Sequence, residues 1–107
     1  MKHNFDKVFS SLKETAKANL PAGAQALLYG SRARGDANEI SDWDVLIILD
    51  KDNLEKSDYD SAAFPFTSLG WDLNIRLNPV LYTLKEWEAS SFTPFYKNVQ
   101  EEGIAFL

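Results

Sequence analysis

Two acidic residues separated by one position, Asp42 and Asp44, are the residues in this sequence best suited to chemistry. They lead into the apolar run 45–49, which is typical of a buried strand. Because side chains alternate along a strand, both carboxylates project from the same face. Neighbouring carboxylates repel each other unless a cation lies between them, and hard oxygen ligands of this kind suit Mg²⁺ bound together with phosphates. The pair therefore predicts a Mg²⁺ site.

A Gly-Ser turn, Gly30-Ser31, precedes the acids and follows the apolar run 24–29, which predicts a first strand. Where such a turn opens a helix, backbone N–H groups without an intrahelical partner favour phosphate, and Ser31 adds a hydroxyl. Arg32 and Arg34 come next. Each is interpreted either as a solvated side chain or as a phosphate contact, and we expect only one of them to face a substrate.

The spacing of these features resembles a known signature. Gly30-Ser31, then ten residues, then Asp42-Trp43-Asp44 is similar to the G-S-x10-D-x-D pattern of the DNA polymerase beta-like nucleotidyltransferases, and the short chain resembles their minimal branch from about Asn4 to about Trp87. The resemblance implies an α+β fold with a mixed sheet and helices packed on one face. It also implies a nucleoside triphosphate substrate, Mg²⁺ as cofactor, and attack of an acceptor hydroxyl on the α-phosphorus with release of pyrophosphate.

A third acid on a neighbouring strand completes the two-metal site in this family. Residues 69–78 alternate between apolar and polar types, which predicts a strand, and Asp72 is the only carboxylate in that run. Asp72 is therefore the candidate third ligand. In relatives the acid often falls nearer the end of the strand, where Arg76 and Asn78 stand. The first placement favours an enzyme, and the second favours a non-catalytic nucleotide-binding or partner-binding module.

Composition sets further bounds. A chain of 107 residues with 45% apolar and 13% aromatic residues is expected to form one domain, residues 1–107, with a real core. The absence of cysteine and the single histidine exclude a disulfide framework, a thiolate zinc site and a Ser-His-Asp triad. The net charge of -5 argues against a nucleic-acid partner. With no secretion leader and no run of eighteen apolar residues, a cytoplasmic protein without membrane insertion is expected.

The remaining elements are helical or irregular. Apolar spacing predicts a helix from about residue 5 to the Pro-Ala-Gly stop at 21–23, and a short helix near 54–63 that Pro65 ends. Thr83 with Glu86 fits a capping box, and Thr93 before a proline predicts another helix start.

The C-terminal tail, residues 92–107, is apolar and has two readings. It packs on the sheet, or it forms a surface for a helical partner protein or a second copy of the chain. Minimal members of the resembled family often work beside a separate helical partner, with toxin–antitoxin pairs a known setting. The acceptor is left open among a protein hydroxyl, a small molecule such as an aminoglycoside and a nucleic-acid end, and the resemblance favours nucleotide transfer onto such a partner.

Overall fold

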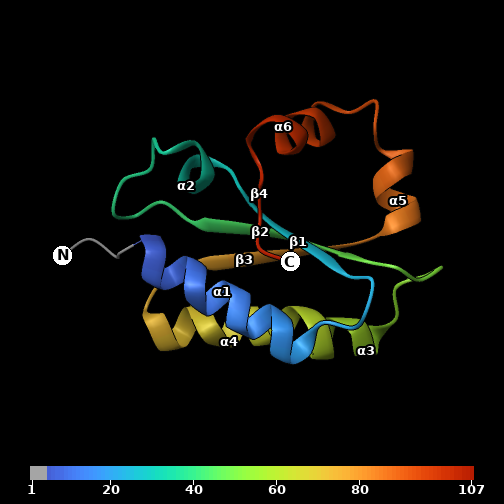
Figure 1. Ribbon diagram of the computed structural model, residues 1–107, viewed down its shortest axis with the longest axis horizontal. Helices are drawn as coiled ribbons and strands as arrows, with labels where there is room; N and C mark the ends of the chain where they lie inside the picture. The colour runs from blue at the N-terminus through green and yellow to red at the C-terminus, as the bar shows by residue number, and fades with distance from the viewer. Residues whose placement is uncertain (1–4) are drawn as a thin grey trace.

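A four-stranded mixed sheet forms the centre of the computed structural model, which describes residues 5–107 (Figure 1). The strands are β1 (Gln25–Tyr29), β2 (Trp43–Leu49), β3 (Leu77–Thr83) and β4 (Ile104–Ala105), in the order β3-β2-β1-β4. β2 pairs with β1 antiparallel and with β3 parallel, and β4 pairs antiparallel with β1. The expected α+β class with a mixed sheet is confirmed.

Helices lie on both sides of this sheet. They are α1 (Phe5–Asn19), α2 (Ser31–Arg34), α3 (Lys56–Asp58), the π-helical turn η1 (Tyr59–Ala63), α4 (Phe64–Leu73), α5 (Leu84–Ala89) and α6 (Pro94–Glu102). The two longest helices, α1 and α4, cover one face, and α5 and α6 lie on the other, whereas helices on one face only are expected from the sequence (Figure 1). No helix in residues 5–107 is long and apolar enough to cross a membrane.

The central strand β2 is buried on both faces, which explains its unbroken apolar run. Val45, Ile47 and Leu49 belong to the core cluster that includes residues of α1 and α4. Leu46 and Ile48 pack in a second cluster with residues of α5 and α6. The rigid placement of β2 fixes the acids at its beginning.

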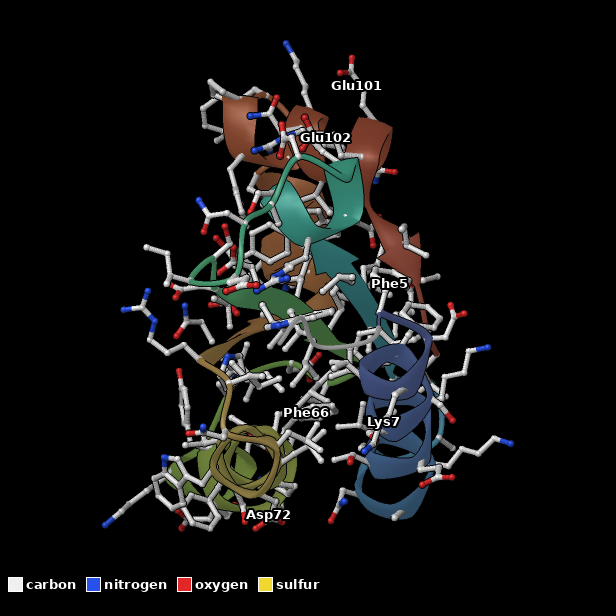
Figure 2. All side chains as sticks on the ribbon, turned by 90° about the vertical axis from the view of Figure 1, so that its left-hand side faces the viewer. Phe5, Lys7, Phe66, Asp72, Glu101 and Glu102 are labelled. Atoms are coloured by element: carbon white, nitrogen blue, oxygen red, sulfur yellow. The ribbon has the colours of Figure 1, made fainter. Side chains whose placement is uncertain are left out.

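The expected strand over residues 69–78 is wrong. Residues 64–73 form α4, Asn74 ends it in the left-handed conformation with φ of 56°, and β3 begins only at Leu77. Buried Phe66 and Gly70 are four residues apart, and Figure 2 shows Phe66 pointing from α4 toward the space beside α1. Helical packing therefore overrides the local alternation.

The expected stop at Pro65 is also wrong. Pro65 lies in the first turn of α4, where a missing N–H and a fixed φ are tolerated. The π-helical turn η1 precedes it and joins α3 to α4 without a break. The crossover from β2 to β3 is thus helical from residue 56 to residue 73.

The C-terminal elements follow their local signals. Thr83 and Glu86 form the expected capping box, and Thr93 accepts a hydrogen bond from the N–H of Tyr96. Phe106 is buried, with its ring 6.0 Å from that of Phe66. Much of the apolar tail is therefore core.

Candidate active site

The two acids of the signature lie at the beginning of β2, at one edge of the sheet. Trp43, between them, is buried, whereas Asp42 and Asp44 are partly exposed on the opposite face. Asp44 is the register partner of Tyr29 on β1 and of Asn78 on β3. The end of β1 and the beginnings of β2 and β3 therefore meet at this edge.

Asp42 is held by two side chains from the β3 side. Nδ2 of Asn78 donates to Oδ2 of Asp42 at 2.9 Å, and the same amide lies 3.4 Å from Oδ1 of Asp44. Nε of Arg76 lies 2.8 Å from Oδ1 of Asp42, an ion pair in which the arginine side chain is largely exposed. That buried oxygen nevertheless accepts no hydrogen bond from the described residues. Arg76 is therefore the cation already beside this oxygen, and a metal here would share or replace that contact.

Gly30 brings the backbone of the turn against Asp44. Its φ is 77° and its ψ is -160°, a backbone conformation that residues other than glycine rarely adopt. A Cβ atom at this position would lie 2.7 Å from Oδ2 of Asp44. Glycine is therefore required for the turn to pass so close to the carboxylate.

Ser31 starts α2 directly after this turn. Since α2 has only four residues, a phosphate at this turn would meet the first backbone N–H groups rather than a long helix dipole. Gly35 ends α2 with φ of 86°, and its N–H donates to the carbonyl of Ser31. The turn thus places the start of α2 beside Asp44.

Arg32 is engaged within the protein. Its guanidinium lies 4.6 Å from the centre of the Trp43 ring, and Nη2 donates to the carbonyl of Ser41 at 2.9 Å. A weaker contact of 3.4 Å joins Nη2 to the carbonyl of Glu39. Arg32 therefore holds in place the connector, residues 39–41, that leads into Asp42.

Arg34 pairs with two acids on the surface. Nε lies 3.1 Å from Asp36, and Nη1 lies 3.1 Å from Glu102 of α6. Both contacts are exposed, so they bind weakly in water. Arg32 and Arg34 both contact other residues of this chain. Arg34 would have to leave Asp36 and Glu102 to contact a phosphate.

Asp72 is not brought to the acid pair. It is exposed on α4, and Figure 2 shows it on the outer side of that helix, turned away from the sheet. Among residues 5–107 no group of three His, Cys, Asp or Glu side chains is arranged to hold a metal. The position facing the pair is taken by Asn78, in the place where the sequence left Arg76 and Asn78 as alternatives to the third acid.

The pair itself fits a single Mg²⁺ ion. Two partly exposed carboxylates offer hard oxygen ligands, and the amide of Asn78 contains a carbonyl oxygen as well as its donor nitrogen. Magnesium in phosphate sites commonly uses one or two carboxylates plus substrate phosphates. Two acids are therefore enough for one metal, while a second metal lacks its carboxylate.

Tyr29 reports the charge of this site. Burial raises the pKa of Tyr29 to about 12, with a further contribution from the negative charge of Asp44. The phenol therefore stays neutral at physiological pH and packs with its ring 5.3 Å from that of Phe95. Tyr29 therefore lies beside Asp44 as a neutral, half-buried side chain.

Comparisons with known proteins bear on the family and the fold of the chain. A family model for the nucleotidyltransferase domain matches residues 9–105. A solved toxin–antitoxin complex with AMP-PNP is similar in fold, with a TM-score of 0.64 and 19% identity over 98% of this chain and 73% of that one. A mutant of the toxin–antitoxin pair MntA-HpeT has a TM-score of 0.61 and 16% identity, with the same coverages. No curated protein sequence matches the chain significantly. Since the family model spans most of its length, the chain belongs to the nucleotidyltransferase domain family.

Proposed function

We propose that the chain binds a nucleoside triphosphate as its Mg²⁺ complex and transfers the nucleoside monophosphate to an acceptor hydroxyl. The observation that carries this proposal is the contact between the two halves of the signature: Gly30 lies against Asp44, so phosphate donors and metal ligands meet in one place. When bound, Mg²⁺ would neutralise charge on the triphosphate and stabilise the departing pyrophosphate.

The roles of the residues follow from their positions. Gly30 and Ser31 bind the β- and γ-phosphates, and Asp42 and Asp44 hold the metal and so orient the α-phosphate. The acceptor oxygen forms a bond to the α-phosphorus, the bond from that phosphorus to the bridging oxygen breaks, and pyrophosphate leaves. The hydroxyl proton passes to water.

We further propose that the acceptor is a hydroxyl of a partner protein, since the two solved structures above come from toxin–antitoxin complexes. The surface of the tail left for such a partner, or for a second copy, is small. The large apolar side chains exposed there are Phe92, which is strongly exposed, and Ile104 and Leu107, which are less so.

A second candidate function is nucleotide binding without transfer. The observation that favours it is Asn78, which stands beside Asp42 and Asp44 where a third carboxylate would complete a two-metal site. Loss of that carboxylate weakens the ion that activates the nucleophile, while the pair can still hold the ion that travels with the triphosphate.

Label transfer separates the two candidates. The protein is incubated with α-labelled nucleoside triphosphates, Mg²⁺ and lysate from its own source, and label is sought on any protein or small molecule. We expect transfer by the parent, none by Asp44→Asn, and more by Asn78→Asp, which restores three acids. Asn53→Asp adds the same charge on an exposed loop and serves as the control. Nucleotide binding without transfer, in the parent and in Asn78→Asp, would favour the binding module.

A readout without activity accompanies this test. Three adjacent carboxylates repel each other, so Asn78→Asp should lower the melting temperature in the absence of metal and regain it with Mg²⁺. An Asn78→Asp protein whose melting temperature does not depend on Mg²⁺ would show that residue 78 does not reach the metal.

A further inference from the structure

A hollow of about 580 Å³ opens next to the acid pair, between the connector 39–41 and residues 70–76 at the end of α4. This volume is within the range of sites for small molecules. Its lining combines apolar side chains, Ile40, Trp71 and Ile75, with the guanidinium groups of Arg32 and Arg76. Nothing in the signature accounts for this hollow.

Trp71 is the unusual member of the lining. It is 69% exposed, whereas Trp43 and Trp87 are 1% and 5% exposed. Its ring forms a T-shaped pair with the Phe64 ring, with centroids 5.7 Å apart and planes at 79°. Ile40, on the same hollow, is 75% exposed. A flat ligand can therefore cover the indole and the isoleucine together.

The hollow is linked to the acid pair through Arg76 and Asn78, although neither acid lines it. A second, smaller hollow of about 230 Å³ shares Trp71, Ile75 and Arg76 with the first and extends to Asn78. Asn78 donates to Asp42, and Nε of Arg76 lies 2.8 Å from the same carboxylate. A ligand that reaches from the indole along Arg76 arrives at the metal ligands.

The order of strands sets the direction of a bound nucleotide. Gly30 follows β1, the acids begin β2, and Asn78 begins β3, so they cross one edge of the sheet in the order β1, β2, β3. A triphosphate with its terminal phosphates on the Gly30–Ser31 turn and its metal on the acids has its other end on the β3 side. The hollow lies on that side.

We infer that the hollow is the nucleobase subsite, in which the base of the nucleoside triphosphate stacks on Trp71. This inference rests on the function proposed above. Bases stack on aromatic side chains regardless of their identity, because every base has a π-face. Arg76 lies along the path between base and acids, and Arg32, tied to the carbonyls of Ser41 and Glu39, keeps the opposite rim in place.

Two probes test the subsite separately from the phosphate site. Binding of ATP and of inorganic tripolyphosphate, each with Mg²⁺, is measured by calorimetry for the parent, Trp71→Ala, Trp71→Phe and the control Phe92→Ala, which removes another exposed aromatic ring. Trp71→Ala should weaken ATP binding about 5- to 150-fold and leave tripolyphosphate binding unchanged. Trp71→Phe should recover most of the loss, and Phe92→Ala should bind both probes as the parent does.

Fluorescence gives an independent readout. Because Trp71 is the exposed tryptophan, ATP with Mg²⁺ should protect the parent from quenching by acrylamide, and tripolyphosphate should not. Equal ATP affinity in the parent and in Trp71→Ala, with tripolyphosphate still bound, would overturn the subsite and leave the proposed function standing. Normal ATP binding with slowed label transfer in Trp71→Ala would also overturn it, by assigning the hollow to the acceptor. If the parent binds neither ATP nor tripolyphosphate, the proposed function is refuted and the subsite with it.

Discussion

Gly30→Ala is the substitution for which the structure makes the most specific prediction. A Cβ atom at this position would lie 2.7 Å from Oδ2 of Asp44, a separation that real Cβ contacts almost never show. The backbone must also keep a φ of 77° that is nearly restricted to glycine. The Asp44 side chain can turn away, so the new methyl group displaces the proposed metal ligand rather than the strand.

The magnitude has two parts. The backbone conformation costs about 1–3 kcal/mol of folding free energy, as for other side chains held in such regions. The displacement of Asp44 appears in binding, where loss of a charge-assisted ligand contact costs about 1.5–3 kcal/mol or more. We therefore expect Gly30→Ala to lose stability modestly and Mg²⁺-nucleotide binding by about tenfold or more.

Gly35→Ala is the matched control. Gly35 also has a positive φ, 86°, but a Cβ atom there meets nothing within 4 Å. This variant should lose about 1–2 kcal/mol of folding free energy and keep nucleotide affinity. Urea unfolding gives the stabilities, and calorimetry with a non-hydrolysable ATP analogue and Mg²⁺ gives the affinities. If Gly30→Ala binds as tightly as Gly35→Ala, the close approach of the turn to Asp44 does not matter for the site.

Four further outcomes are expected. Ser31→Ala should weaken Mg²⁺-nucleotide binding in calorimetry by about 1–3 kcal/mol and leave urea unfolding of the free protein unchanged, whereas an equal loss of stability would make Ser31 a helix cap. Arg32→Lys loses the planar stack on Trp43 and should lower the free energy of unfolding by about 1–2 kcal/mol, and an unchanged value would show that Arg32 does not fasten the connector. Phe106→Ala empties a core position and should cost about 3–5 kcal/mol in urea unfolding, which an exposed tail would not. The folded-state pKa of Tyr29 is raised from 10.0 to about 12, so its neutral phenol contributes stability that is complete below pH 10 and is lost as pH rises through 12. Tyr29→Phe should therefore lose less stability than the parent between pH 10 and pH 12. Identical slopes of unfolding free energy against pH in the two proteins would refute the raised pKa.

The elements with local signals could be predicted from the sequence. The apolar runs before Gly30 and after Asp44 predicted β1 and β2, and side-chain alternation placed Asp42 and Asp44 on one face opposite buried Trp43. The capping residues that open α5 and α6 also act locally, since their side chains bond to N–H groups three residues away. Each of these signals is complete within a few residues.

Residues 64–78 show where this reasoning fails. Leu69 and Leu73 share a face both in a strand and in a helix, so the local pattern does not separate the two. Contacts with distant residues decide it: Phe66 packs near Phe106, and a Cβ atom on Gly70 would lie 3.0 Å from Cβ of Leu77. Tertiary packing therefore selects the helix.

The same error displaced the candidate third ligand. With a strand over 69–78, Asp72 lay on the polar face, whereas in the helix it faces outward. The position opposite Asp44 is set by the parallel register of β2 and β3, which pairs Asp44 with Asn78. That register depends on the length of the crossover and is not encoded in either strand alone.

Binding of a non-hydrolysable ATP analogue to the parent and to Asp42→Asn/Asp44→Asn, titrated with and without Mg²⁺, tests the central claim most directly. Both acids remain polar and of similar size in the variant, so the fold is kept while the metal ligands lose their charge. The account predicts binding by the parent that requires Mg²⁺, and loss of the Mg²⁺-dependent part in the variant. Binding that is equally tight in the two proteins, or independent of Mg²⁺ in the parent, would contradict a metal-nucleotide site at Asp42 and Asp44.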